Sequence, residues 1–143
     1  MAITTFKAKV VSTDDPNKYI SYSRDFTVKF QTNELNNGYD EGITPNEGIL
    51  CALGACEDIV AASFYKKEKF EYSSLYIPVR GEISGKRPGF DNIGVDIHFR
   101  TPKEKTEITK FVKFMEDTCP VRDNLVNTVP IVTKEVKSEN SSG

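Results

Sequence analysis

A strongly marked helix begins near residue 44 and constrains the fold more than any other feature of the sequence. Thr44 suits the N-cap, Pro45 suits the first helical position, and Glu47 completes a capping box. Apolar residues then recur every three or four positions, which predicts one apolar stripe on a helix that ends near residue 67. The stripe comprises Ile49, Leu53, Cys56, Val60 and Phe64. Small residues surround it, so we expect a central helix that other elements approach closely.

The segment before this helix favours strands. Residues 6–30 are rich in β-favouring types and are broken at 14–17 by D-D-P-N, which is turn chemistry. Apolar residues occupy every second position over 25–30, which predicts a strand with one covered face. The stretch 33–42 is rich in Asn, Gly and Asp and is predicted to be a loop.

Two further strands are predicted after the helix, at 74–84 and 92–100, joined by G-K-R-P-G at 85–89. Pro78 suits the first of them best near a sheet edge, because proline has no N–H for a strand ladder. In the second strand, apolar residues alternate with polar ones. This alternation turns His98, the only histidine of the chain, away from the covered face.

A second helix is predicted after Thr101 and ends at Pro120. Its apolar stripe comprises Ile108, Phe111, Val112, Met115 and Cys119. A last strand is predicted at 129–136, followed by a polar, disordered tail at 137–143. This element order predicts an α+β fold with helices packed on an antiparallel sheet. Residues 1–136 are expected to form a single domain.

Composition narrows the functional classes. The formal net charge of −2 gives no field that would attract nucleic acid or an anionic membrane, and the 38% apolar and 28% charged fractions are those of a soluble globular protein. No apolar run approaches the roughly 20 residues of a membrane-spanning helix, and the N-terminus does not resemble a secretion signal. We therefore expect a cytoplasmic protein whose three cysteines are thiols rather than a disulfide framework.

Cys56 and Cys119 each lie on an apolar helical stripe. If the two stripes bury against each other, the thiols can meet in a dry pocket and form a redox site. The alternative is that both are packing residues, because free cysteine is often buried. Cys51 lies about 140° around the same helix from Cys56, so the two cannot pair, and Cys51 is interpreted as a packing residue.

Other cysteine chemistry fits the sequence poorly. The outward orientation of His98 disfavours a cysteine–histidine dyad, and the spacings of a zinc site or a phosphate loop are absent from the sequence. Peroxide or disulfide chemistry remains, and it needs a positive charge beside the thiolate. The helix start lies about 16 Å from Cys56, which is too far for the helix dipole to supply that charge. The candidate arginines are Arg24, Arg80, Arg87, Arg100 and Arg122.

Two motifs resemble a known family. Residues 44–56, T-P-N-E-G-I-L-C-A-L-G-A-C, are similar to the T-P-x-E-L-L-L-x-A-L-G-G-C signature of the OsmC/Ohr proteins, the osmotically induced and organic-hydroperoxide-resistance proteins. Residues 119–121, C-P-V, resemble their second motif at the end of the last helix. The predicted element order matches over the whole chain. The resemblance implies an intertwined homodimer with its active sites at the subunit interface.

The resemblance also implies a thiol peroxidase cycle without a metal or flavin. Cys56, as a thiolate, would attack a hydroperoxide and become a sulfenic acid, Cys119 would condense with it to a disulfide, and an external dithiol would reduce that disulfide. Apolar side chains would favour an apolar substrate, among them Phe64, Phe111 and Met115. Two alternatives stay open: a non-catalytic dimeric module that binds an apolar ligand, and a thiol sensor with slow turnover.

The family's thiolate is held by an arginine from the N-terminal strands, and that arginine by a glutamate near the helix start. By position these correspond to Arg24 and Glu47. In the peroxidase branches the glutamate stands ten residues before the cysteine, where this chain has Asn46. Nine helical residues turn Glu47 about 180° from Cys56, so Glu47 would act across a dimer interface or through a bridging arginine. The alternative is that Glu47 only completes the capping box with Thr44.

Overall fold

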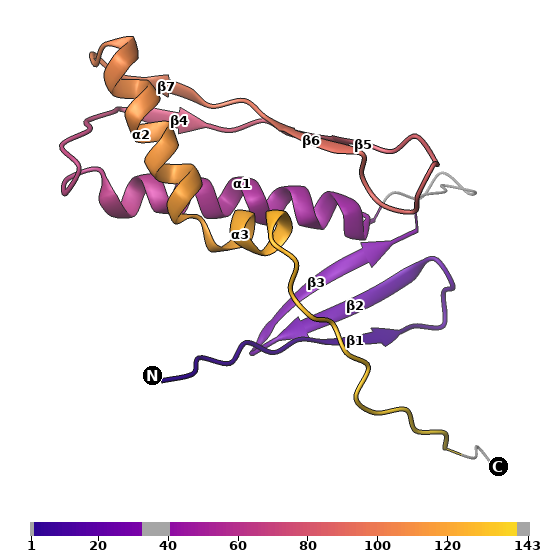
Figure 1. The fold of residues 1–143 in the computed structure, drawn as a ribbon. Coiled ribbons are helices and arrows are strands. Elements are labelled where there is room, and N and C mark those ends of the chain that lie inside the picture. Colours follow the sequence, from indigo (N-terminus) through magenta and orange to yellow (C-terminus); the bar gives the residue numbers. More distant parts are fainter. Residues whose placement is uncertain (1, 33–40, 140–143) are drawn as a thin grey trace.

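One long helix, α1 (Pro45–Phe64), runs through the computed structural model, which describes residues 2–32 and 41–139 (Figure 1). The predicted capping box is confirmed. The Glu47 N–H donates to the Thr44 hydroxyl at 3.2 Å, and the Thr44 N–H donates to Glu47 Oε1 at 2.9 Å. These reciprocal bonds satisfy amide groups that the first helical turn leaves without partners. The helix therefore begins where the sequence predicts.

The N-terminal strands form a three-stranded antiparallel sheet in the order β1 (Lys9–Ser12), β2 (Lys18–Ser23) and β3 (Phe26–Gln31). The predicted strand–turn–strand opening is confirmed. Asp15 stabilises the first turn, because its Oδ1 accepts from the main-chain N–H of Asn17 at 2.9 Å. The predicted loop at 33–42 lies outside the described residues except for its last two positions.

The two strands predicted after α1 are each divided into two. The pieces are β4 (Ser74–Tyr76), β5 (Val79–Glu82), β6 (Asn92–Val95) and β7 (His98–Arg100). β4 pairs with β7 and β5 pairs with β6, both antiparallel. The interruption falls at Pro78, whose carbonyl accepts from the Asp96 N–H at 3.0 Å but which has no N–H to continue the ladder. The expected antiparallel sheet is thus several small sheets.

The second predicted helix is confirmed as α2 (Lys105–Thr118), and it ends before Pro120. The sequence analysis missed a short third helix, α3 (Pro120–Val126), which begins at that proline. Cys119 separates the two helices with an extended backbone, φ −73° and ψ 112°. Proline disfavours a helical conformation of the residue before it, and it also suits the first position of a helix. Pro120 can therefore end α2 and begin α3.

The strand predicted at 129–136 is wrong. The chain there has no regular secondary structure and pairs with no strand among the described residues, and its apolar side chains Ile131, Val132 and Val136 are exposed. β-branched residues favour an extended backbone, but a strand also needs a partner edge. The backbone preference of these residues is therefore not enough to form a strand.

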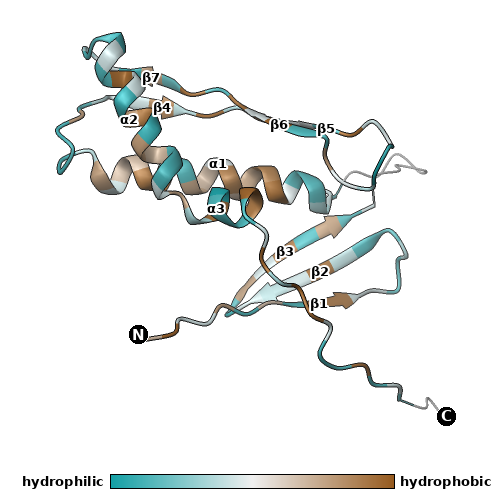
Figure 2. Cartoon of the chain, in the orientation of Figure 1, coloured by the Kyte–Doolittle hydropathy of each residue, from teal (hydrophilic) through white to brown (hydrophobic). Residues whose placement is uncertain are grey.

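The hydrophobic core lies where α1 meets α2. Its buried members are Val60, Ala61, Phe70, Phe111 and Met115. The rings of Phe70 and Phe111 stack with centroids 4.3 Å apart, and brown apolar bands alternate with polar ones along both helices in Figure 2. Within the described residues, none of the helices combines the length and apolarity needed to cross a membrane. The fold is α+β, as predicted.

The small residues of α1 have a defined role at Gly54. A Cβ atom there would lie only 3.2 Å from Cγ2 of Val79 on β5. The glycine thus permits the close approach of β5 to α1 that the sequence predicted. Leu53 and Val60 of the predicted stripe are buried, whereas Ile49 near the start of α1 is exposed. The helix is therefore most deeply buried in its second half.

Candidate functional site

Cys119 lies at the junction of α2 and α3 and is 1% exposed. Its N–H donates to the carbonyl of Met115 at 3.1 Å, which completes the last turn of α2. Its Sγ accepts from the main-chain N–H of Arg122 at 3.3 Å, which caps the first turn of α3. The main chain of Cys119 is therefore bonded to α2 and its sulfur to α3.

Cys56 projects from the middle of α1 and is half-buried. Its side chain lies close enough to that of Cys119 to raise the pKa of the Cys119 thiol. The apolar stripes of α1 and α2 pack against each other, and the two cysteine side chains lie near one another at this contact. One thiol of the pair is enclosed and the other is accessible.

The pKa of Cys119 is raised from an ordinary value of 9.0 to about 11, and burial is the largest cause. The neighbouring Cys56 side chain and the negative charge of Glu57 contribute to this increase, whereas the Arg122 N–H acts in the opposite direction. Cys119 is consequently a neutral thiol at physiological pH. A neutral, enclosed thiol is a poor nucleophile toward molecules from solution.

A buried ion pair lies beside the two cysteines. The Glu57 side chain is completely buried, and Arg122 donates to its Oε1 from Nε at 2.9 Å and from Nη2 at 2.5 Å. Nη1 of Arg122 also lies 3.8 Å from Oε2 of Glu116. Oε2 of Glu57 is buried and has no hydrogen-bond partner among the described residues. Such a carboxylate is tolerated only because a cation faces it.

The sequence analysis missed Glu57 and named Arg122 only as one of five candidate arginines. A signal was present, because Glu57 stands four residues after Leu53 and three before Val60, on the apolar face of α1. A charged residue at such a position needs a buried partner. Arg122, three residues after Cys119, places its guanidinium against this carboxylate.

Arg24 and Glu47 lie elsewhere in the chain. Arg24 occupies the turn between β2 and β3 at φ 55°, with its guanidinium over the ring of Phe26 at 4.9 Å from the centroid. Among the described residues it forms no hydrogen bond or ion pair. The capping box holds Glu47, and its hydrogen bonds to Thr44 lower the pKa of that carboxyl. The catalytic roles of both residues stay predictions that need a second chain.

The exposure of His98 and Cys51 tests two other predictions from the sequence. His98 is exposed, as predicted, and its ring stacks on that of Tyr76 with centroids 4.6 Å apart. Cys51 is exposed, so its interpretation as a buried packing residue is wrong for the single chain. The reason is that the face of α1 that carries Cys51 is left open by the elements around it.

A pocket of about 420 Å³ lies against Arg122, although no cysteine lines it. Residues of α1, α3, β6 and the loop between β5 and β6 line it, and Arg122 forms part of its wall. Apolar members include Leu53, Ile93 and Leu125, and Asn46 contributes an amide. Arg122 therefore connects the buried Glu57 with a partly apolar space large enough for a small organic molecule.

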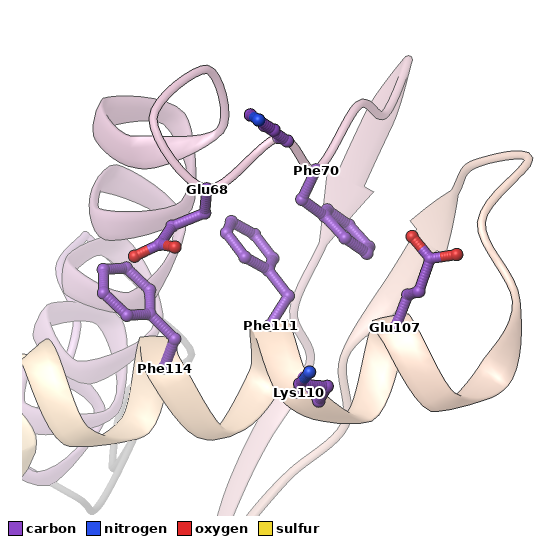
Figure 3. Close-up of a pocket in the computed structure, with 7 residues that line it drawn as sticks. Glu68, Phe70, Glu107, Lys110, Phe111 and Phe114 are labelled. Carbon is purple, nitrogen blue, oxygen red and sulfur yellow. The ribbon is translucent and has the colours of Figure 1, made fainter.

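A second pocket, of about 310 Å³, lies against the core and is separate from the cysteines (Figure 3). Its aromatic floor is formed by Phe70, Phe111 and Phe114, and Lys69 and Lys110 contribute to its charged rim with Glu68 and Glu107. No cysteine lines it. Its groups suit packing against an apolar surface but supply no nucleophile.

Comparison with known proteins identifies the family. Residues 38–134 match the model of the OsmC family, described as OsmC-like protein. The chain therefore belongs to the OsmC-like protein family. No curated protein matches it.

Solved structures share the fold. An OsmC-like protein from Mycoplasma pneumoniae superposes with a TM-score of 0.78 at 21% identity, over 86% of this chain and 88% of the other. An organic hydroperoxide resistance protein OsmC from Legionella pneumophila gives 0.66 at 15% identity, over 87% and 91%. The organic hydroperoxide resistance protein OhrB of Bacillus subtilis gives 0.62 at 17% identity, over 85% and 90%. At these identities the likeness establishes the fold.

Proposed function

We propose that the protein is a cysteine-based peroxidase that reduces organic or other hydroperoxides and serves in defence against oxidative stress. One observation carries the proposal: the side chain of Cys56 lies beside that of Cys119, where α1 contacts the junction of α2 and α3. The asymmetry of the pair supports a role for each thiol. Cys56 is the more accessible and attacks the peroxide, whereas the enclosed, neutral Cys119 resolves the product.

The cycle balances without a metal or flavin. The Cys56 thiolate attacks the peroxide, the O–O bond breaks, and the leaving alkoxide takes a proton to become an alcohol, so that Cys56 becomes a sulfenic acid. The Cys119 sulfur then attacks the Cys56 sulfur. An S–S bond forms, the S–O bond breaks, and the hydroxyl leaves as water with the proton from Cys119. An external dithiol reduces the disulfide and is itself oxidised.

The comparisons support this class of reaction. Two similar structures carry names that describe organic hydroperoxide resistance proteins. The pocket next to Arg122 favours a hydroperoxide with an apolar group, because Leu53, Ile93 and Leu125 line it. The same pocket would serve the alternative of a non-catalytic ligand-binding module.

A homodimer is part of the proposal. Apolar side chains are exposed at both ends of the described chain: Ile3 is 91% and Ile131 is 93% exposed, and Val10 and Phe26 project openly from the N-terminal sheet. Patches of this kind usually mark an interaction surface, and a symmetric second copy can cover them. In such a dimer Arg24 and Glu47 would act on the Cys56 of the partner chain.

The test is a stoichiometric reaction followed by a turnover assay. One equivalent of an organic hydroperoxide should consume two thiols and give a Cys56–Cys119 disulfide by peptide mapping. Cys56→Ser should abolish peroxide consumption, whereas Cys51→Ser, a matched substitution on the same helix, should leave it unchanged. Steady turnover with a dithiol, without added metal or flavin, supports an enzyme. The disulfide without turnover indicates a sensor, and unchanged consumption by Cys56→Ser refutes the proposal.

A further inference from the structure

The Glu57–Arg122 ion pair connects the same two segments as the cysteine pair. Glu57 follows Cys56 directly on α1, and Arg122 stands three residues after Cys119, at the start of α3. The carboxylate and guanidinium therefore cross between α1 and α3 next to the point where the two sulfurs meet. The two contacts form parallel links between these helices.

We propose that this ion pair is a positioning device for the resolving step, which holds Cys119 in line for attack on the oxidised Cys56. The inference rests on the proposed peroxidase function. Arg122 contacts both parts of the site: its main-chain N–H donates to Cys119 Sγ at 3.3 Å, and its side chain binds Glu57 through two nitrogens. A movement of α3 away from α1 would therefore disturb both contacts.

Stability alone does not account for such a pair. Buried ion pairs are often no more stabilising than apolar side chains of similar size, because both charges lose their hydration. Glu57 carries an additional cost, since its Oε2 is buried and has no partner among the described residues. Geometry supplies a reason, because two N–H donors of one guanidinium converge on Glu57 Oε1 and so restrict the direction of the Arg122 side chain.

The two chemical steps depend differently on this geometry. Attack on the peroxide uses the Cys56 sulfur and the peroxide oxygen, and Cys119 need only stay nearby. Resolution requires the Cys119 sulfur to approach the Cys56 sulfur opposite the departing hydroxyl. A misplacement of about 1 Å between reacting groups can cost roughly 100-fold in rate, so resolution is the step that loosening α3 should slow.

The experiment measures the two steps separately in single-turnover reactions of the full chain. A sulfenic-acid-specific trapping reagent reports attack, and non-reducing mass analysis reports the disulfide. In Glu57→Gln and Arg122→Lys, resolution should slow by about 10- to 100-fold while attack changes little, so the sulfenic acid should accumulate. A surface ion pair supplies the control: Lys113 Nζ lies 2.8 Å from Asp117 Oδ1 on α2, and Asp117→Asn should leave both rates unchanged.

A double variant separates positioning from folding. Glu57→Met combined with Arg122→Leu replaces the pair by apolar groups and should keep the thermal midpoint near that of the wild type, yet it should retain the slow resolution. Resolution at the wild-type rate in this variant or in Arg122→Lys would overturn the inference, as would equal losses of attack and resolution in Glu57→Gln. If the wild-type protein resolves no sulfenic acid at all, the proposed function itself fails.

Discussion

Arg122 extends from the first turn of α3 to Glu57 on α1 and binds a single carboxylate oxygen with two of its nitrogens, at 2.9 and 2.5 Å. The carboxylate is fully buried, whereas the arginine is partly exposed and lines the pocket beside the site. The segment that carries Cys119 thus also supplies the guanidinium that neutralises Glu57, the residue next to Cys56. A substitution of Glu57 on α1 or of Arg122 on α3 should therefore change the contact between the two helices.

The raised pKa of Cys119 predicts a pH-dependent stability of the reduced protein. The unfolded thiol ionises near 9.0, whereas the folded thiol keeps its proton until about pH 11. The folded state therefore binds more protons between these values, and this contribution to stability is fully present below pH 9 and is lost as the pH rises to 11. Urea unfolding should show the free-energy difference between wild type and Cys119→Ala shrinking over that interval. A difference that stays constant with pH would contradict the enclosed thiol.

Met115 should contribute strongly to stability, because its side chain is fully buried one turn before Cys119. Met115→Ala removes core contacts and leaves a cavity, so the free energy of unfolding should fall by about 2–5 kcal/mol. Met115→Leu conserves volume and should cost less than about 1.5 kcal/mol. Urea titration of both variants measures the difference. Equal losses would show that the site tolerates no change of shape.

The structural and catalytic roles of Glu47 can be separated by a substitution that keeps the cap. Glutamine can replace glutamate in a capping box, so Glu47→Gln should melt close to wild type. Thr44→Ala removes the N-cap acceptor and should cost about 1 kcal/mol. If Glu47 acts across a dimer interface, Glu47→Gln should slow the attack on peroxide while the fold is unchanged. Wild-type attack by Glu47→Gln would restrict this residue to the cap.

The proposed homodimer predicts a role for Arg24 that depends on a second chain. Sedimentation should give twice the monomer mass of 16.0 kDa. A mixture of Arg24→Ala and Cys56→Ser proteins, co-refolded, should regain peroxidase activity, because one of the two sites in a mixed dimer combines an intact arginine with an intact cysteine. A monomeric protein, or a mixture as inactive as its components, would contradict this arrangement.

Much of the fold follows from local patterns. The Thr44–Glu47 box specifies the start of α1, and the three-to-four-residue spacing of apolar side chains specifies α1 and α2. Those stripes also indicate which helix faces are buried, and Cys56 and Cys119 both lie on them. Periodicity suffices here because it acts through neighbouring turns of one helix.

The incorrect predictions concern how segments pair or pack with other segments rather than the conformation that their residues favour. Pro78 interrupts a run of β-favouring residues because it cannot donate to a neighbouring strand. Residues 129–136 have the composition of a strand but no partner edge among the described residues. Pro120 follows the end of α2 and begins α3, and the presence of a proline does not by itself show whether a new helix follows.

The sequence by itself therefore determined α1, α2 and the apolar stripes on which Cys56 and Cys119 lie. Only the tertiary structure decided which charges accompany that pair. Glu57 and Arg122 are 65 residues apart, and neither has a neighbour along the chain that indicates the other. A carboxylate becomes part of a site when packing removes its water and leaves one cation within reach, and that condition depends on how α3 folds back onto α1.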